Sequence, residues 1–360
     1  MLVVSNLFTY IFIILLTGIL LISLKPDRDK DIRGKRFLKW GSIVGLILTT
    51  GVSVYQLCHM LYTQFSLPLS EAIFQVLTKF QAGHAWLAIV FCLFVMMIIE
   101  GTSQKRSHRF TEYSQLFLLI GIMFFISLTS HSGASEGLLG SLVHLLHMLA
   151  FSFWLGPLFV MAWLTKPKES IHDFHRWFSP LAMFTFSMLV ISGILLMNFL
   201  IPNYMNSWAI DYGQAMLWKH LLFIPVIVFG FRHLYLLKKY PQWLSKIEYQ
   251  RSFRVESLYA FLVLAISSWM TEREPPLEIS MSEGYNSLFL LFHNQAVDGV
   301  LQSSWTFTSV TFIIGSLVIF LSTGYYLLKR KLLSIAVIML LLAHICLYIG
   351  LMLIRIIILG

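Results

Sequence analysis

Ten long apolar runs constrain the fold of this chain more than any other feature of its sequence. A helix that crosses a bilayer needs about 20 mostly apolar residues. The runs lie at 3–24, 38–61, 83–100, 114–130, 139–165, 178–201, 215–238, 254–271, 305–328 and 332–357. Because backbone groups in lipid must be paired within their own segment, each run is expected to be a helix. The sequence therefore predicts an all-α fold, a polytopic transmembrane helical bundle of about ten spans.

Composition supports this class of protein and argues against others. Hydrophobic residues make up 58% of the 360 residues and charged residues only 12%, against about 25% charged residues in soluble domains. The net charge of +9 needs no nucleic-acid partner, because basic residues orient membrane proteins. The three cysteines, Cys58, Cys92 and Cys346, form no C-x-x-C pair, which argues against a disulfide framework or a zinc ribbon.

The basic residues predict how the chain is oriented. All but four of the 26 lysines and arginines lie in alternate loops or at the adjoining helix ends; the exceptions are Lys79, Lys219, Arg273 and Arg355. The positive-inside rule assigns the basic loops to the cytoplasm. We therefore expect both termini to be extracytoplasmic, in a multi-pass protein of a bacterial cytoplasmic membrane.

The chain is expected to consist of three regions. They are N-terminal helices at 1–130, a central core at 131–276, and an outer loop with the last two helices at 277–360. In that loop, the stretch "SLFLLFHNQAV" is expected to form a short interfacial helix.

Six histidines fall at one predicted depth, close to the outer ends of their helices: His59, His84, His131, His144, His147 and His220. His144 and His147 project from one helix face, and Met148 follows His144 by one turn. Imidazole and thioether groups suit copper, whereas hard cations need carboxylates, of which the spans hold few. The six histidines and Met148 are therefore the predicted copper ligands, and deeper thioethers such as Met183 are candidates to pass Cu(I) inward.

Histidines in such positions can also serve purposes unrelated to copper transport. A single transmembrane histidine can bond a neighbouring helix for about 0.6 to 2 kcal/mol, but six at one depth favour a functional site. A haem-binding redox protein resembling a b-type cytochrome is a rival, because two histidines on facing helices can ligate haem. A third possibility is a copper sensor or assembly factor, which would bind copper without changing the copper content of the cell.

Several short stretches resemble the CopD family of copper-resistance membrane proteins, which includes the membrane part of a Bacillus copper importer. They are "SHSG" at 130–133, "HLLHMLAFSFWLGPL" at 144–158, "FHRWFSPLAMFTFSMLVISGILL" from 174, "DYGQAMLWKHLLF" from 211 and "RSFRVESLYAFLVLAISSWMTEREPP" from 251. The resemblance covers about 130–276 and places these residues on family positions: Tyr212, Gly213, Lys219, Arg251 or Arg254, Glu256, Pro275 and Pro276. Pro157 departs from the family, which has a second glycine there. We expect Glu256 to lie at the start of its helix and to stabilise the helix dipole.

The resemblance implies copper ion transport, usually as uptake across the cytoplasmic membrane, with an extracytoplasmic copper-binding donor. We expect that donor to be a separate protein, because no stretch resembles the fused copper-binding domain of some family members. No Walker A sequence is present, so ATP hydrolysis is not expected to drive transport. The prediction is a transporter rather than an enzyme. Its partners would be copper ions, the donor and the lipid bilayer, with no nucleic acid.

Overall fold

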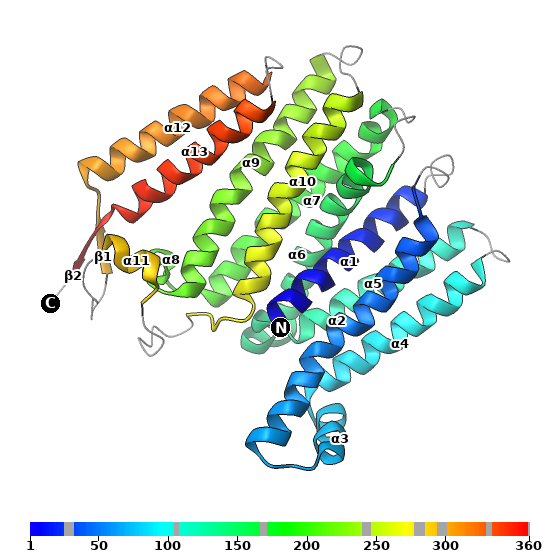
Figure 1. Cartoon of the computed structure of the whole chain (residues 1–360). Helices are drawn as coiled ribbons and strands as arrows, with labels where there is room; N and C mark the ends of the chain where they lie inside the picture. Colours follow the sequence, from blue (N-terminus) through cyan, green and yellow to red (C-terminus); the bar gives the residue numbers. More distant parts are fainter. Residues whose placement is uncertain are drawn as a thin grey trace. The chain divides into compact units, whose positions relative to one another are not determined.

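Helices make up nearly all of the computed structural model, which describes residues 1–24, 32–103, 108–165, 171–239, 246–276, 285–293, 301–328 and 333–358 (Figure 1). Within these ranges, ten helices are long and apolar enough to cross a membrane. They are α1 (Leu2–Ser23), α2 (Lys35–Gln64), α4 (Gln81–Gly101), α5 (His108–Leu128), α6 (His131–Trp163), α7 (Ile171–Leu200), α9 (Asp211–Lys239), α10 (Lys246–Met270), α12 (Phe307–Leu328) and α13 (Leu333–Met352). The predicted helical fold with ten candidate spans is confirmed. The side of the membrane that each terminus faces stays a prediction, and several of the basic residues behind it lie outside the described residues.

The chain divides into two compact units, an N-terminal unit (Met1–Leu200) and a C-terminal unit (Ile201–Gly360). The N-terminal unit holds α1 to α7, and the C-terminal unit holds α8 to α13 with two short strands. The three regions expected from the sequence, with boundaries at 130 and 276, stay a prediction.

The core of the N-terminal unit forms around α1. Apolar side chains of α1, α2, α4 and α5 make one buried cluster, which also takes in Met148 of α6. Gly18 of α1 and Gly156 of α6 let two backbones meet, because a Cβ added at Gly18 would lie 2.2 Å from the carbonyl oxygen of Gly156. Small residues at helix crossings allow this close approach in membrane proteins.

A helix that the sequence did not predict, α3 (Leu69–Lys79), packs against the end of α2 (Figure 1). The 30 residues of α2 extend over about 45 Å, which exceeds the bilayer core of about 30 Å. Ala72 and Val76 of α3 pack on Val54, Cys58 and Leu61 of α2. The hydropathy of such a short helix is too low to mark a span, so the apolar runs gave no sign of it.

Helix α6 contains a break near its start. Gly137 has φ 57° and ψ −132°, a conformation that non-glycine residues rarely adopt. Before the break, the Ser130 hydroxyl accepts a hydrogen bond from the Gly133 amide at 3.1 Å and caps the first turn. His131 therefore belongs to the short segment before the break, whereas His144 and His147 belong to the long segment after it.

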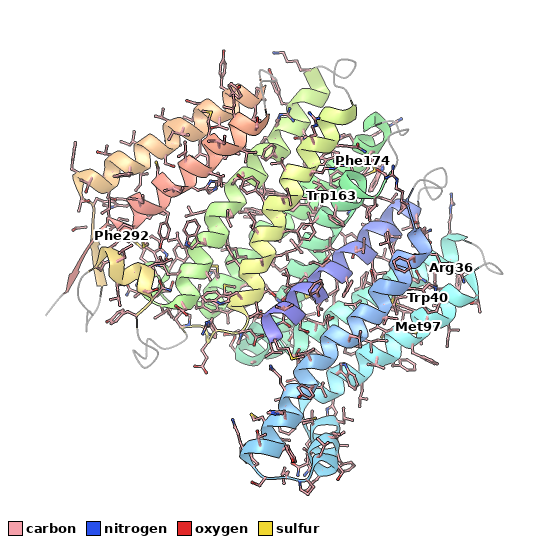
Figure 2. The ribbon with its side chains drawn as sticks, viewed as in Figure 1. Arg36, Trp40, Met97, Trp163, Phe174 and Phe292 are labelled. Atoms are coloured by element: carbon pink, nitrogen blue, oxygen red, sulfur yellow. The ribbon has the colours of Figure 1, made fainter. Side chains whose placement is uncertain are left out.

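The C-terminal unit contains two helical hairpins, α9 with α10 and α12 with α13, and two short helices, α8 (Tyr204–Ser207) and α11 (Ser287–Phe292). Helix α11 confirms a short helix over the first six residues of the predicted stretch. The last four residues of that stretch, 294–297, lie outside the described residues, and the interfacial position stays a prediction. Phe292 of α11, labelled in Figure 2, meets Tyr348 of α13 edge-on, with ring centroids 6.3 Å apart.

The end of the last apolar run differs from the prediction. The sequence placed a span at 332–357, but α13 ends at Met352 and Arg355–Ile358 forms strand β2. Strand β2 pairs antiparallel with β1 (Leu301–Ser304), the segment just before α12. Three consecutive isoleucines favour a strand, and hydropathy alone does not separate such a run from the end of a helix.

Candidate metal centre

Five of the six predicted histidine ligands lie in the N-terminal unit, and His220 lies in the C-terminal unit. Among the residues that the structure describes, no three side chains of His, Cys, Asp or Glu lie close enough to hold one metal ion together. A site with two such ligands, or with methionine sulfur beside them, is compatible with this finding. The assignment of the six histidines and Met148 as copper ligands stays a prediction.

His147 is held on α6 by a contact with the neighbouring helix. Its Nδ1 lies 3.1 Å from the hydroxyl of Ser192 on α7. The Ser192 hydroxyl in turn donates its hydrogen to the carbonyl oxygen of Met188 at 2.7 Å. Because that hydrogen is committed, the serine oxygen accepts from His147, and the ring hydrogen lies on Nδ1. This tautomer leaves the lone pair on Nε2, the atom with which such a histidine binds a metal.

His144 and Met148 share one face of α6, but their neighbours differ from those of His147. His144 is half-buried, and Met148 is buried in the apolar cluster formed with α1, α2, α4 and α5. His147, by contrast, faces α7. Met148 can therefore pair with His144, which lies one turn away on the same face. It does not pair with His147, because the two side chains contact different helices.

The remaining histidines of the N-terminal unit lie nearer the helix ends. His59 is exposed near the end of α2, with its ring 6.0 Å from that of Tyr55. His84 is exposed in the first turn of α4, and its Nε2 lies 2.9 Å from the carbonyl oxygen of Thr78 in α3. A carbonyl accepts only, so His84 carries its hydrogen on Nε2 and its lone pair on Nδ1. His131 is half-buried at the first residue of α6.

His220 is exposed on α9, and its Nδ1 lies 2.7 Å from the hydroxyl of Tyr204 in α8. Burial raises the pKa of the Tyr204 phenol to about 12, so the hydroxyl keeps its hydrogen at neutral pH. A neutral phenol donates and accepts. The contact therefore fixes the position of the His220 ring and allows either tautomer.

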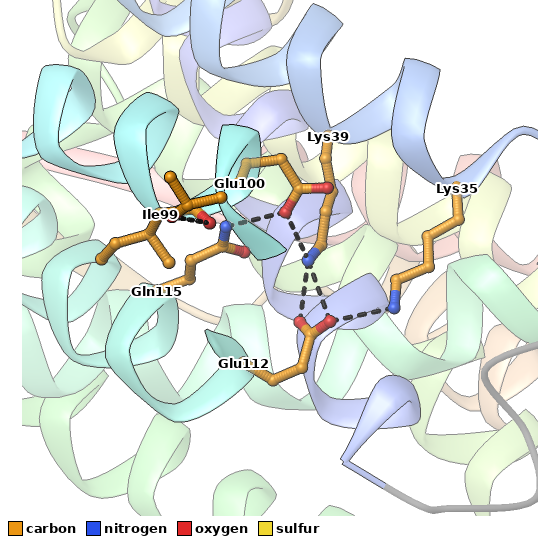
Figure 3. Close-up of polar contacts among 7 residues, drawn as sticks. Lys35, Lys39, Ile99, Glu100, Glu112 and Gln115 are labelled. Carbon is orange, nitrogen blue, oxygen red and sulfur yellow. Dashed lines mark hydrogen bonds and ion pairs between the residues drawn. The ribbon is translucent and has the colours of Figure 1, made fainter. Parts of the chain in front are cut away.

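Sequence reasoning missed a buried charged cluster in the N-terminal unit (Figure 3). The Nζ of Lys39 on α2 lies 3.1 Å from Glu100 of α4 and 2.9 Å from Glu112 of α5, and all three side chains are buried. The Gln115 amide donates to Glu100 at 2.9 Å, and Lys35 lies 2.9 Å from Glu112. The sequence did contain a signal, because Lys39, Glu100 and Glu112 each lie within two residues of the end of an apolar run.

A second buried cluster lies in the C-terminal unit and corrects the expectation for Glu256. Helix α10 begins at Lys246, so Glu256 lies in its third turn rather than at its start. Glu256 is buried, with its Oε2 3.0 Å from His233 Nδ1 of α9. The helix dipole acts mainly within the first turn and therefore does not explain this carboxylate.

Comparison with known proteins gives three findings. Residues 1–141 match the family model described as copper resistance protein D-like, N-terminal domain, and residues 172–270 match copper resistance protein D. The copper transport protein CutJ of Bacillus subtilis (strain 168) is 25% identical over 215 residues, which cover 57% of this chain and 39% of that protein. The chain thus spans less than half the length of this relative. No solved structure matches the chain.

Proposed function

Because the chain belongs to the copper resistance protein D family, we propose that it moves copper ions inward across the cell membrane through a histidine and methionine site on α6. Its character as a multi-pass membrane protein related to copper transport rests on the family matches and the ten apolar helices. The direction of transport and the ligands belong to the proposal.

The observation that carries the proposal is the contact of His147 with Ser192. A metal-binding histidine almost always donates its second N–H to an acceptor, which orients the ring and makes the other nitrogen more basic. Ser192 supplies that acceptor at 3.1 Å, because its own hydrogen is donated to Met188. His144, one turn before His147 on the same helix, supplies a second imidazole.

Copper chemistry explains the rest of the site. His59, His84 and His131 lie toward the predicted outer ends of their helices, where they would receive copper from a separate extracytoplasmic donor. His144 and His147 would take the ion next, and His220 would bind copper within the C-terminal unit. Thioethers select Cu(I) over hard cations, so Met148 would favour Cu(I) beside His144, with which it shares a helix face.

The test compares the double variant His144→Ala/His147→Ala with wild type in cells grown at limiting copper. We expect lower copper accumulation and weaker copper binding by the purified protein, with unchanged abundance in the membrane. Leu142→Ala/Leu146→Ala is the matched control, because both leucines are exposed on the same part of α6. Unchanged accumulation and binding in the histidine variant would refute the proposal.

An absorption spectrum separates this proposal from the haem alternative. A haem ligated by two histidines gives a Soret band, whereas Cu(I) bound by imidazole and thioether absorbs no visible light. We expect the purified protein to be colourless and to bind copper, and a stoichiometric Soret band would favour the redox protein.

A further inference from the structure

Buried polar side chains lie at intervals along α9, α10 and α13 of the C-terminal unit. We call Gln214, Tyr348, His344, Tyr259, Glu256 and His233 the polar column; each of them is buried. Gln214 and His233 lie near the two ends of one candidate span, Asp211–His233. They are 19 positions apart, which corresponds to about 28 Å of helix, close to the bilayer core of about 30 Å.

The first end of the column is a hydrogen-bonded pair. The Tyr348 hydroxyl of α13 donates to Gln214 Oε1 of α9 at 2.9 Å, and the Gln214 amide donates to the carbonyl oxygen of Trp208 at 2.6 Å. Tyr348 stacks on Trp218, with centroids 4.5 Å apart. In the predicted orientation, this end is the outer one.

His344 lies at the middle of the column, with a carbonyl oxygen at each ring nitrogen. Its Nε2 lies 2.8 Å from the carbonyl oxygen of Leu221, and its Nδ1 contacts that of Leu340. A neutral imidazole has a single N–H, so both contacts become hydrogen bonds only when the ring holds a second proton. The ring of Tyr259 lies 6.3 Å away, and its buried hydroxyl has no hydrogen-bond partner among the described residues.

The other end is a relay of four buried side chains. Arg232 donates to the Ser252 hydroxyl at 2.9 Å, and that hydroxyl lies 2.7 Å from His233 Nε2. The serine oxygen accepts from arginine and keeps its own hydrogen, which can be donated to Nε2; that arrangement puts the ring hydrogen on Nδ1. Nδ1 lies 3.0 Å from Glu256 Oε2, within ion-pair distance, although that oxygen accepts no hydrogen bond among the described residues.

Neighbouring elements contribute mainly uncharged groups to the column. Helix α12 contributes the Leu327 carbonyl to Arg232 at 3.4 Å and the ring of Phe320, 5.2 Å from His344. On α10 itself, the two arginines nearest to Glu256 are exposed, Arg251 and Arg254. The structure thus places Tyr259 beside His344, and Arg232 beside the His233–Glu256 pair.

Two other roles fit the His233–Glu256 end of the polar column less well. Serine, histidine and carboxylate in this order also form nucleophile triads, but Ser252 is fully buried and already bonded to Arg232 and His233. A purely structural ion pair explains neither the two carbonyls at His344 nor the buried Tyr259 hydroxyl. Chains of ionisable residues inside membrane helices are typical of proton relays.

We propose that the polar column carries protons through the C-terminal unit and couples their movement to that of copper; the coupling rests on the function proposed above. One proton binds the His233–Glu256 pair and changes its net charge from −1 to 0, and release of that proton restores the carboxylate. His344 accepts a proton on its second ring nitrogen and gives it up again. Transient water would bridge the gaps between these groups.

The experiment uses the full chain reconstituted into liposomes of phosphatidylcholine and phosphatidylglycerol that enclose a pH-sensitive dye. Cu(I), kept reduced with ascorbate, is added outside, and internal pH and internal copper are both recorded. We expect wild type to show a pH change that requires copper. Glu256→Gln and His344→Asn should lose the pH change and keep copper binding. Glu274→Gln is the matched control, because Glu274 is exposed in the same unit.

Each outcome decides one claim. Copper uptake by wild type without a pH change overturns proton coupling and leaves the transport function standing. Absence of copper uptake by wild type refutes the transport function itself. A pH change that persists in folded Glu256→Gln and His344→Asn overturns the column as the route. Should Glu256→Gln aggregate on size exclusion, Ser252→Ala replaces it, because it interrupts the relay without removing a charge.

Discussion

Gly18 of α1 and Gly156 of α6 meet with their backbones in contact. A Cβ added at Gly156 would lie 2.7 Å from the amide nitrogen of Gly18, closer than real Cβ atoms come to a neighbour. The crossing therefore fixes how deeply α6 sits against α1, and α6 carries His144 and His147. The two imidazoles thus depend on a contact about three turns further along the same helix.

Adding a methyl group at this crossing should destabilise the N-terminal unit. In Gly156→Ala the two helices must move apart, and overpacking of this kind costs about 1–3 kcal/mol. We expect a lower thermal midpoint in detergent. Gly121→Ala is the control, because nothing lies within 4 Å of a Cβ added there. Equal midpoints for the two variants would contradict the close crossing.

Lys39→Met should destabilise the protein more strongly. It leaves the buried carboxylates of Glu100 and Glu112 without the ammonium group that lies within 3.1 Å of both. Removing one member of a buried ion pair costs about 3–5 kcal/mol. The expected result is poor folding, seen as aggregation on size exclusion. Lys79→Met, an exposed lysine at the end of α3, should have no effect.

A rescue variant separates electrostatics from packing in this cluster. Lys39→Met combined with Glu100→Gln and Glu112→Gln removes every buried charge of the triad, so it should recover much of the lost stability. If the triple variant is no more stable than Lys39→Met, the loss comes from side-chain packing and not from uncompensated charge.

The sequence predicted the spans well because membrane crossing is a property of local hydropathy. It located helix starts poorly for the same reason. Hydropathy marks where a chain enters the apolar layer, whereas a helix can begin earlier among polar residues, as α10 does at Lys246. Glu256, near the start of the apolar run, was therefore assigned to a first turn, although it lies in the third.

A single sequence does not show which side chains pair across helices. The spacing of His144 and His147 shows that they share a face, but nothing in the sequence indicated that Ser192 would be the partner of His147. The same holds for Lys39, Glu100 and Glu112, which are far apart in the chain and meet only through helix packing. Helical periodicity shows which residues share a helix face. The tertiary fold determines which neighbouring helix that face contacts.

Gly137→Ala tests whether the break in α6 matters for the site. The glycine has φ 57° and ψ −132°, and forcing another residue into such a conformation costs about 1–3 kcal/mol. We expect a lower thermal midpoint, or a straightened helix that displaces His131 and changes its accessibility to chemical modification. Gly101→Ala is the control, because its surroundings are open and it has no positive φ. A neutral result for Gly137→Ala on both measurements would show that the break is not required.

Ser192→Ala should weaken copper binding without removing a ligand. The hydroxyl accepts the Nδ1 hydrogen of His147 at 3.1 Å, so its loss frees the ring to rotate and to change tautomer. Loss of such a supporting partner typically lowers metal affinity about 10- to 100-fold. Copper affinity of the purified protein, measured by competition with a Cu(I) chelator, checks this.

Ser187→Ala provides the matched control for that measurement. Ser187 lies on the same helix, is exposed, and donates to a carbonyl one turn back as Ser192 does, at 3.0 Å to Met183. Its loss should therefore reproduce any effect of the missing helix bond and leave copper affinity unchanged. If Ser192→Ala binds copper as tightly as Ser187→Ala, the contact with Ser192 does not orient a metal ligand. His147 would then have no supporting evidence as a copper ligand.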